Sequence, residues 1–294
     1  MSDNSGKIWR VIDLLQWSND YLGSKGVESP RIETEWMLRH VLNWSRLDIY
    51  MNHERPLDEA ELAAFKALLK KRVQGIPIQY VLGYTEFMGY QFKVNPAVLI
   101  PRPETELLVE KAFKILKQTN DPSVNILDVG TGSGCIAVSL AAECPRCRVV
   151  ALDVSPEALA TATRNAELNG VAERLQLIKM DILKETPEGP PFFLIVSNPP
   201  YIAGEYWDTL PDLVKSNEPR IALYPGGDEL IFYRRLARLA QLRLSEDGCL
   251  LTEIGGSYQE SAVCQVYHDH NLDIREVVRD YTGESRIVVA SRAA

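Results

Sequence analysis

The chain reads Asp128-Val129-Gly130-Thr131-Gly132-Ser133-Gly134 at the end of an apolar run that begins at Asn125. The apolar run predicts a buried strand, and segment 136–142 behind the glycines predicts a helix. Glycines in such a turn let the backbone approach a ligand that rests near the helix N-terminus. This stretch therefore predicts an α/β fold with a ligand site at the carboxyl end of a strand.

The alternation of strand and helix continues along the chain. Apolar runs predict strands at 149–152, 175–179, 192–196 and 249–254, and helical patterns cover 156–169 and about 228–244. This alternation indicates a mostly parallel sheet that is covered by helices on both faces. The last two predicted strands, 274–278 and 286–290, are joined by Asp280-Tyr281-Thr282-Gly283. A turn this short requires antiparallel pairing.

Residues 1–75 are predicted to form a separate domain, a small bundle of four or five helices. Ser29-Pro30 indicates a helix start with a capping serine, and Asp58-Glu59-Ala60-Glu61 resembles a capping box. Short β-prone runs separated by glycines predict a β-hairpin linker over 76–102. Because Pro103 can open a helix, we assign 103–294 to the second domain.

The composition indicates an ordinary globular protein with no general attraction to nucleic acid. Of the 294 residues, 46% are hydrophobic and 24% are charged, and the formal net charge is -8 at pH 7. We find neither a bilayer-spanning apolar stretch nor a signal-peptide pattern, so we expect a cytoplasmic protein. The five cysteines lack a disulfide framework, as expected in a reducing cytoplasm. Cys144-Pro145-Arg146-Cys147 lacks a second ligand pair, so no metal or redox site is predicted.

Residues around the glycine turn predict a bound nucleoside. The pattern G-x-G-x-G of Gly130 to Gly134 differs from the dinucleotide fingerprint, which has a further residue before its last glycine. Asp153 ends the next strand roughly twenty residues on, where an acid can hold both hydroxyls of a ribose. Asp181 follows the third strand and is placed to accept from an adenine amino group. Alternatively, the glycine turn is a tight turn that binds no ligand, and Asp181 is a solvated loop carboxylate.

The stretch Asn198-Pro199-Pro200-Tyr201 follows the predicted strand 192–196. Prolines donate no backbone hydrogen bond and hold the preceding residue extended, so this turn is pre-ordered and its carbonyls are free. The Asn198 side-chain oxygen and the Pro199 carbonyl can bind the two N–H groups of a planar NH2 group. Tyr201 would stack against this substrate. The residues therefore predict a site that aims an NH2 nitrogen at a methyl group.

Methyl transfer needs such a site and hydride transfer does not, so S-adenosylmethionine is favoured over NAD as the cofactor. A reversed last strand also fits a seven-stranded methyltransferase sheet. Positioning and electrostatics can supply most of the catalysis, and no metal is needed. Adenine, cytosine and glutamine all present a planar NH2 group, so these residues leave the substrate open.

The chain resembles the release factor glutamine methyltransferases, the PrmC/HemK family, over essentially its full length. The matching segments are Gly75-Ile76-Pro77, Tyr80 to Gly83, Glu86-Phe87-Met88-Gly89, Ile100 to Glu106, Asp128 to Gly134, Ser197 to Ile202, Glu218-Pro219, Glu253-Ile254-Gly255, and the ending with Asp280, Gly283 and Arg286. Segment 100–106 together with Asn198 to Tyr201 and the helical N-terminal domain makes the resemblance specific. DNA amino-methyltransferases share only Asn198 to Tyr201.

The resemblance implies methylation of the side-chain amide of the glutamine in the Gly-Gly-Gln motif of class I peptide chain release factors. The N-terminal domain would recognise the release factor. Asn198, Pro199, Pro200 and Tyr201 would bind the glutamine, with Asn198, Pro199 and Tyr201 as catalytic residues and Leu99 against the glutamine stem. The cofactor would be bound by Gly130, Thr131, Gly132, Ser133, Gly134, Asp153, Asp181, Ile182 and Asn198. Ile182 and Leu183 stand where some relatives carry an aromatic residue, and Glu229 where glycine is common.

Two other functions remain open from the sequence. A nucleic-acid amino-methyltransferase is disfavoured by the acidic balance and by the lack of an evident target-recognition domain. A non-catalytic module that binds S-adenosylmethionine is disfavoured because Asn198 and both prolines are present. We expect neither a membrane partner nor direct DNA binding. Lys70-Lys71-Arg72 is interpreted as a solvated helix end, with contact to the release factor or RNA as the alternative.

Overall fold

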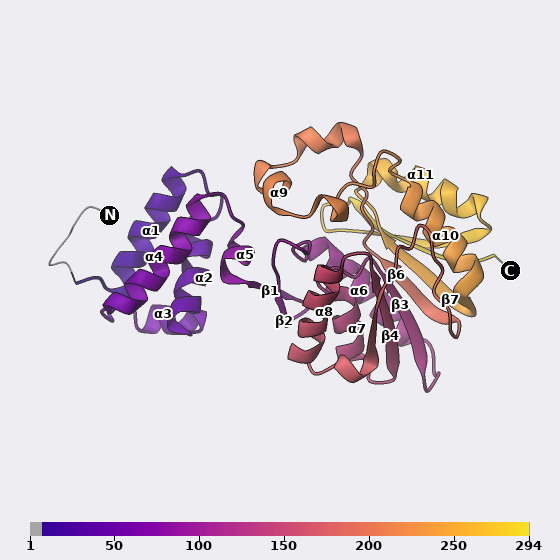
Figure 1. Cartoon of the computed structure of the whole chain (residues 1–294), viewed down its shortest axis with the longest axis horizontal. Coiled ribbons are helices and arrows are strands. Elements are labelled where there is room, and N and C mark those ends of the chain that lie inside the picture. Colours follow the sequence, from indigo (N-terminus) through magenta and orange to yellow (C-terminus); the bar gives the residue numbers. More distant parts are fainter. Residues whose placement is uncertain (1–7, 294) are drawn as a thin grey trace. The chain divides into compact units, whose positions relative to one another are not determined.

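The computed structural model describes residues 8–293, and the chain divides between Gly83 and Tyr84 into two compact units. Figure 1 shows helices in the first unit and a sheet with helices in the second. This is the predicted α/β class with a helical N-terminal bundle. The predicted linker 76–102 contributes residues to both units. Over this range, no helix has the length and apolar character needed to cross a bilayer.

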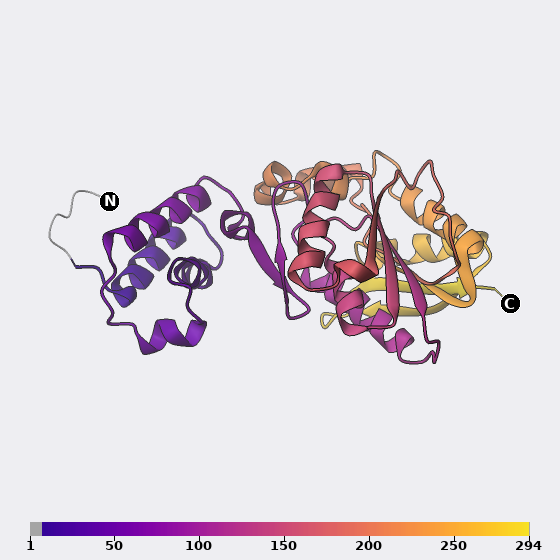
Figure 2. The ribbon, with the colours of Figure 1, turned by 60° about the horizontal axis from the view of Figure 1, so that its bottom comes forward.

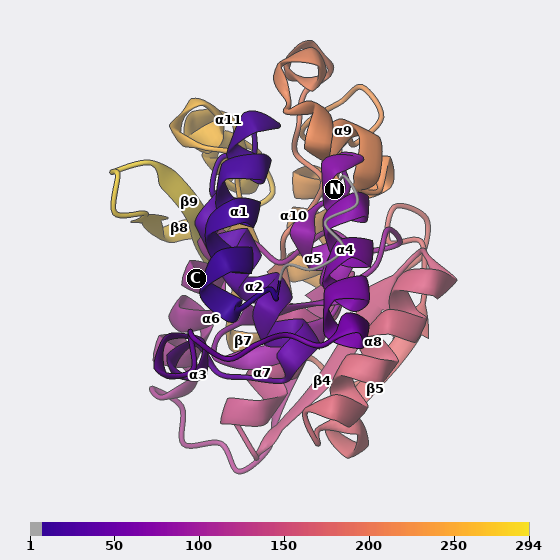
Figure 3. The same ribbon diagram turned by 90° about the vertical axis from the view of Figure 1, so that its left-hand side faces the viewer.

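The first unit contains a bundle of helices, as the sequence predicts. They are α1 (Val11–Ser24), α2 (Pro30–Leu42), α3 (Arg46–Met51), α4 (Glu59–Val73) and α5 (Ile78–Leu82). Helix α2 packs against both α1 and α4 (Figure 3). Leu14, Leu38 and Phe65 are each at most 1% exposed, so these helices bury their apolar faces against one another.

Two predicted helix starts differ in their capping. The capping box at α4 is confirmed, because the Asp58 carboxylate accepts the Glu61 N–H at 2.8 Å and the Glu61 carboxylate accepts the Asp58 N–H at 3.0 Å. At α2, Pro30 occupies the first turn as predicted, but the Ser29 side chain makes no capping bond. The fixed φ of the proline is therefore the start signal that α2 uses.

One residue of the predicted solvated helix end of α4 is buried. Arg72 is 8% exposed, and its Nε lies 2.5 Å from the Glu33 carboxylate of α2. Its charge is therefore paired inside the bundle, and the interpretation as a solvated residue is wrong for Arg72. Lys70 and Lys71 remain exposed, as predicted.

The second unit begins with the predicted β-hairpin. Strand β1 (Tyr84–Phe87) pairs antiparallel with β2 (Tyr90–Lys93). Met88 and Gly89 both have positive φ, 51° and 77°, which is the geometry of the tight two-residue turns that match strand twist. The Met88 N–H donates to the Glu106 carboxylate at 2.6 Å, so the hairpin turn is fixed to the helix that follows.

A seven-stranded sheet forms the centre of the second unit. Its strands are β3 (Val124–Val129), β4 (Cys147–Asp153), β5 (Leu175–Lys179), β6 (Phe192–Ser197), β7 (Leu244–Glu253), β8 (Leu272–Arg279) and β9 (Ser285–Arg292). They lie in the order β5-β4-β3-β6-β7-β9-β8, and β9 runs antiparallel to both of its neighbours. The predicted mostly parallel sheet with a reversed last strand is therefore confirmed.

Helices cover both faces of this sheet (Figures 1 and 2). They are α6 (Pro103–Leu116), α7 (Cys135–Glu143), α8 (Pro156–Leu168), α10 (Ile231–Arg243) and α11 (Ser257–Asp269), and the short α9 (Asp212–Asn217) follows β6 in the chain. Neighbouring residues of β3 point to opposite faces, with Ile126 in the apolar cluster of α6, α7 and α8 and Leu127 in the cluster of α10 and α11. Burial on both faces explains the continuous apolar run of this strand.

Strand β7 begins at Leu244, earlier than the predicted 249. The pairing of β7 with β6 shifts in register between Phe192 and Leu194. A Cβ on Gly248 would lie 2.9 Å from the Phe192 carbonyl oxygen, so the two backbones approach closely at this irregularity. A bulged segment does not show the two-residue periodicity from which strands are predicted.

The structure pairs Cys144 and Cys147 in a disulfide, which corrects the expectation drawn from the sequence. Cys144 follows the last turn of α7, and Cys147 opens β4. The Cys147 N–H donates to the Cys144 carbonyl at 2.9 Å, and this tight turn brings the two Cα atoms to 5.4 Å, within the range of disulfides. Cys135, Cys249 and Cys264 are free thiols.

Replacing Gly134 by alanine is expected to destabilise the second unit. Gly134 has a φ of +80°, and an added Cβ would lie 3.1 Å from the Ala162 Cβ of α8. The left-handed backbone costs about 1–2 kcal/mol and the crowding about 1–3 kcal/mol more. Gly283→Ala is the matched control, since Gly283 has a φ of +88° with no atom within 4 Å of an added Cβ. Gly134→Ala should lower the thermal unfolding midpoint more than Gly283→Ala, and equal shifts would contradict the close packing.

Candidate active site

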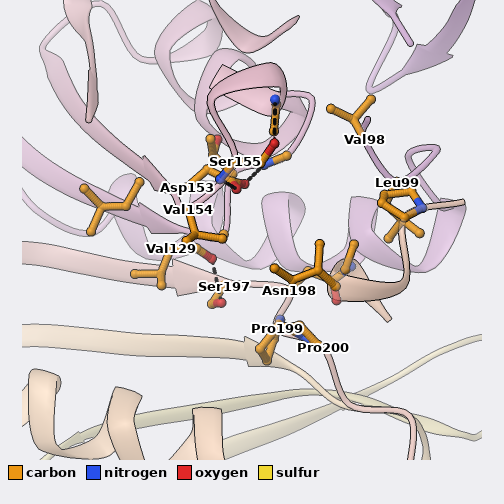
Figure 4. A pocket seen from close by; sticks show the side chains of 18 of the residues that line it. Val98, Leu99, Val129, Asp153, Val154, Ser155, Ser197, Asn198, Pro199 and Pro200 are labelled. Carbon is orange, nitrogen blue, oxygen red and sulfur yellow. Dashed lines mark hydrogen bonds between the residues drawn. The ribbon is translucent and has the colours of Figure 1, made fainter. Parts of the chain in front are cut away.

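A cavity of about 420 Å³ opens at the carboxyl ends of β3, β4 and β6 (Figure 4). This volume is in the range of small-molecule sites. The predicted site residues that line it are Leu99, Gly130, Thr131, Gly132, Ser133, Asp153, Asp181, Ile182, Asn198, Pro199 and Pro200. Gly134 and Tyr201 were also predicted, and they are not among the lining residues.

The turn between β3 and α7 has a backbone shape that favours glycine. Gly130 and Gly132 have φ values of 74° and 56°, and an added Cβ at either position would meet no atom within 4 Å. The N–H groups of Gly130 and Thr131 both donate to the Leu152 carbonyl at 2.9 Å, which holds the turn against β4. The part of the turn formed by Gly130 and Gly132, just before α7, therefore lies beside open space that a ligand near the helix N-terminus could occupy.

Asp128 supports this turn from inside the protein. It is 0% exposed, and its carboxylate accepts a hydrogen bond from the Thr131 hydroxyl at 2.6 Å. Burial raises the pKa of Asp128 to about 7, although the Thr131 bond opposes the shift. Asp128 is absent from the cavity lining, so it acts on the turn and not on a ligand.

Asp153 closes the other side of the turn from the end of β4. One carboxylate oxygen accepts the Gly132 N–H at 2.8 Å and the other accepts the Ser155 N–H at 2.9 Å (Figure 4). Burial raises the pKa of Asp153. Each oxygen retains a second lone pair, so the carboxylate can also accept from two hydroxyl groups of a ligand. The glycine turn and this fixed carboxylate together fit a nucleoside.

Asp181 and Ile182 form a further wall of the cavity after β5. The Asp181 carboxylate pairs with Lys184 at 2.7 Å and accepts the Leu183 N–H at 3.1 Å, and the Lys184 bond lowers the pKa of Asp181. Ile182 is 7% exposed and packs with the α10 cluster. This wall therefore presents an apolar side chain beside a carboxylate that stays ionised.

The turn after β6 presents two hydrogen-bond acceptors beside the cavity. The Ser197 hydroxyl donates to the Val129 carbonyl at 2.7 Å, which fixes the end of β6 to β3 (Figure 4). Asn198 Nδ2 donates to the Thr105 hydroxyl at 3.0 Å. Over residues 8–293, neither Asn198 Oδ1 nor the Pro199 carbonyl accepts a hydrogen bond. Both acceptors therefore remain available to a ligand.

Tyr201 does not form part of the cavity wall. Its ring packs against the apolar cluster of α10 and α11, and its hydroxyl lies 3.4 Å from the Glu253 carboxylate. Burial raises the pKa of Tyr201. The Gln259 side chain donates to the Tyr201 carbonyl at 2.9 Å, which holds the end of the turn. In this arrangement Tyr201 supports the turn from behind.

Asn165 of α8 supports the site and was not found from the sequence. It is 0% exposed, accepts the Lys93 N–H at 2.7 Å, and donates to the Ser133 carbonyl at 2.8 Å and the Lys93 carbonyl at 3.0 Å. One side chain therefore fastens the end of β2 to the glycine turn. In the sequence it is a single polar residue within an amphipathic helix, so no local pattern identifies it.

Glu218 fixes the segment that leads into α6. Its side chain is 2% exposed, accepts the Ile100 N–H at 3.2 Å and forms an ion pair with Arg102. Pro101 and Arg102 line the cavity, so this carboxylate holds part of the wall in place.

Within residues 8–293, no cluster of three or more His, Cys, Asp or Glu side chains has the arrangement of a metal site.

The chain is similar to known methyltransferases. Residues 13–83 match the PrmC N-terminal domain, and residues 104–247 match the methyltransferase small domain. A protein of Chlorobaculum tepidum named release factor glutamine methyltransferase is 43% identical, with 89% of this chain and 95% of that protein covered. The chain belongs to the release factor glutamine methyltransferase family. A protein of the same name from Geobacter sulfurreducens is 42% identical, with 87% of this chain and 88% of that protein covered.

Two solved structures share the fold of this chain. The catalytic domain of hMettl16, in complex with the MAT2A 3'UTR hairpin 6, has a TM-score of 0.55 at 16% identity, covering 82% of this chain and 86% of that one. A methyltransferase from Pyrococcus furiosus has a TM-score of 0.50 at 16% identity, covering 71% and 91%. At this identity the likeness concerns the fold alone.

Replacing Glu218 by glutamine is expected to loosen the cavity wall around Ile100. Glutamine offers one acceptor oxygen in place of two, and its NH2 group cannot accept, so the Ile100 N–H and the Arg102 guanidinium can no longer both be satisfied. Amide hydrogen exchange at Ile100 should accelerate by at least about tenfold, the equivalent of about 1.4 kcal/mol. Asp212→Asn is the matched control, because the Asp212 side chain is 95% exposed in its pair with Lys215. Unchanged protection of Ile100 in Glu218→Gln would contradict this role.

Proposed function

We propose that this chain transfers a methyl group from S-adenosylmethionine to the side-chain amide nitrogen of the glutamine in the Gly-Gly-Gln motif of class I peptide chain release factors. Such a modification would modulate translation termination. The observation that carries the proposal is the pair of unused acceptors, Asn198 Oδ1 and the Pro199 carbonyl, beside a nucleoside-sized cavity. The relatives named release factor glutamine methyltransferase support the choice of substrate.

The chemistry explains why two acceptors matter. A glutamine amide nitrogen is a poor nucleophile because its lone pair is delocalised into the carbonyl group. Asn198 Oδ1 and the Pro199 carbonyl would each accept one N–H, which holds the nitrogen in place and favours its rehybridisation. Positioning of this kind, with dipoles arranged in advance, lowers the barrier without a covalent intermediate.

The cofactor residues follow from the other side of the cavity. S-adenosylmethionine bound here would supply an activated methyl group on its sulfonium. Transfer would break the S–CH3 bond and form the N–CH3 bond, giving S-adenosylhomocysteine, and the amide nitrogen would release one of its two protons to water. We assign Asp153 to the ribose hydroxyls, the backbone of Gly130 to Gly134 to the close approach of the cofactor, and Asp181 with Ile182 to the adenine. The carboxylate lone pairs and the open space at the turn support this assignment.

The remaining assignments concern the protein substrate. Leu99 and Pro200 line the same cavity as Asn198, which supports contact of Leu99 with the apolar stem of the glutamine. We assign residues 1–75 to recognition of the release factor, 76–102 to the linker and 103–294 to transfer. Because release factors act in translation, we expect the enzyme to work in the cytoplasm.

One assay tests the proposed function against its alternatives. The full chain is incubated with S-adenosylmethionine labelled in the methyl group and either a class I release factor or DNA. Label on the release factor, located at the Gly-Gly-Gln glutamine by mass spectrometry, is the expected result. Label on DNA alone would indicate a nucleic-acid amino-methyltransferase, and label on neither would indicate a binding module. Either result would overturn the proposal.

Asn198→Ala is expected to separate chemistry from cofactor binding. The variant should bind S-adenosylmethionine with nearly wild-type Kd, measured by calorimetry, while kcat falls by about tenfold to a thousandfold, the scale of losing one positioned polar group. Asp153→Asn is the contrasting variant. It weakens cofactor binding by about tenfold or more because an NH2 group would then face a backbone N–H. Turnover of Asn198→Ala near the wild-type value would show that the amide is oriented by another group.

A further inference from the structure

A chain of hydrogen bonds leads from Asn198 into the protein interior. Asn198 Nδ2 donates to the Thr105 hydroxyl at 3.0 Å, and that hydroxyl donates to Glu253 Oε2 at 2.7 Å. Thr105 lies in the first turn of α6, and Glu253 is the last residue of β7. Both are 2% exposed. Thr105 reaches the cavity lining and Glu253 does not, so Glu253 can influence a ligand only through other side chains.

The hydrogens available to Thr105 determine which residue donates and which accepts in these two hydrogen bonds. A threonine hydroxyl has one hydrogen to donate, and an ionised carboxylate can only accept. Because Thr105 donates to Glu253, it can only accept from Asn198. The Asn198 amide must then turn its NH2 group toward Thr105 and leave Oδ1 for the cavity. The two ends of an amide are otherwise similar in shape, so it is this bonding that distinguishes them.

We propose that Thr105 and Glu253 are positioning residues that orient the Asn198 amide so that Oδ1 faces the substrate nitrogen. The inference deepens the proposed methyl transfer and rests on it. In the opposite orientation, the NH2 group of Asn198 would face the NH2 group of the substrate, and two donors cannot bond. The amide orientation therefore decides whether the site accepts a planar NH2 group or rejects it.

The charge of Glu253 maintains this direction. Burial and, to a smaller extent, Glu104 of α6 raise the pKa of Glu253 to about 7, against the opposing effects of the Thr105 bond, Arg286 of β9 and the Tyr201 hydroxyl. The Tyr201 hydroxyl faces the second carboxylate oxygen, and the Tyr233 hydroxyl of α10 donates to the Glu253 carbonyl. A further ionisable group nearby is the half-buried Cys135 thiol of α7, whose pKa is raised to about 12 by its removal from water, so it stays neutral.

Protonation of Glu253 would remove the constraint. The protonated carboxyl has a hydrogen of its own and can donate to Thr105, whose hydroxyl is then free to donate to Asn198 Oδ1. The productive amide orientation is therefore favoured above the pKa of Glu253 and lost below it. Turnover should rise with pH through about 7. Because the pKa of Asp128 behind the glycine turn is also about 7, the contribution of Glu253 is the part of this rise that Glu253→Gln removes.

The decisive experiment compares four variants over pH 6 to 9, measuring kcat for methylation of the release factor and the cofactor Kd. Thr105→Val should lower kcat by about tenfold to a hundredfold at every pH, the scale seen when a partner that orients a ligating side chain is removed. Thr105→Ser should recover activity because it restores the hydroxyl. Glu253→Gln should lose the rise near pH 7, since the glutamine side chain does not titrate. Thr252→Val removes another buried hydroxyl of β7, bonded to Tyr267 at 2.7 Å, and should leave kcat unchanged.

A second readout does not need turnover. In protein labelled with nitrogen-15 at asparagine, the Asn198 side-chain NH2 signals should shift with pH through about 7 in the wild type and stay constant in Glu253→Gln. Wild-type kcat in Thr105→Val, or an Asn198 signal that does not titrate, would overturn the positioning role. If the wild type fails to methylate while the Asn198 signal titrates, the proposed function fails and the orientation of the amide stands.

Discussion

The parallel register of the central strands is the constraint on which the site depends. Val129 of β3 pairs with Leu152 of β4 and with Ser197 of β6, so the carboxyl ends of these three strands meet at one edge of the sheet. Each of these strand ends carries one part of the site. The glycine turn follows β3, Asp153 is the last residue of β4, and Asn198 follows β6. No single segment forms a cavity, and the shared register brings the three together. The pairing of the strands therefore determines where the site forms, and the side chains determine its chemistry.

Buried carboxylates then give this edge its rigidity. Asp128 and Glu253 are almost completely removed from water, and each accepts a hydrogen bond from a threonine hydroxyl at the cavity. In surroundings of low dielectric constant, such bonds are strong and their loss is costly, so they hold one arrangement of the wall. The cavity therefore presents acceptors in fixed positions to a ligand. The carboxylates that hold the wall, Asp128 and Glu253, are buried behind it.

Sequence patterns predicted those elements that depend on interactions between residues close together in the chain. The apolar runs around β3 and β6, the glycine turn and the capping box at Asp58 all predicted what the structure contains. The Ser29 cap and the start of β7 were wrong, because in both places backbone geometry overrides residue preference. Asn165 was not predicted, because its hydrogen-bond partners are distant in the chain. The roles of Asn198 to Tyr201 stay predictions, and the place of the Tyr201 ring outside the cavity was not visible in any motif.

The bond between Thr105 and Glu253 spans 148 positions of the chain. Domains form as the chain leaves the ribosome, N-terminal parts first, so α6 and the turn at Asn198 emerge well before the end of β7. Until β7 has been synthesised and has entered the sheet, Thr105 has no carboxylate partner and the Asn198 amide can rotate. A nascent chain that already carries the glycine turn, Asp153 and Asn198 would thus lack an oriented acceptor. Entry of β7 into the sheet and orientation of the Asn198 amide therefore coincide during synthesis.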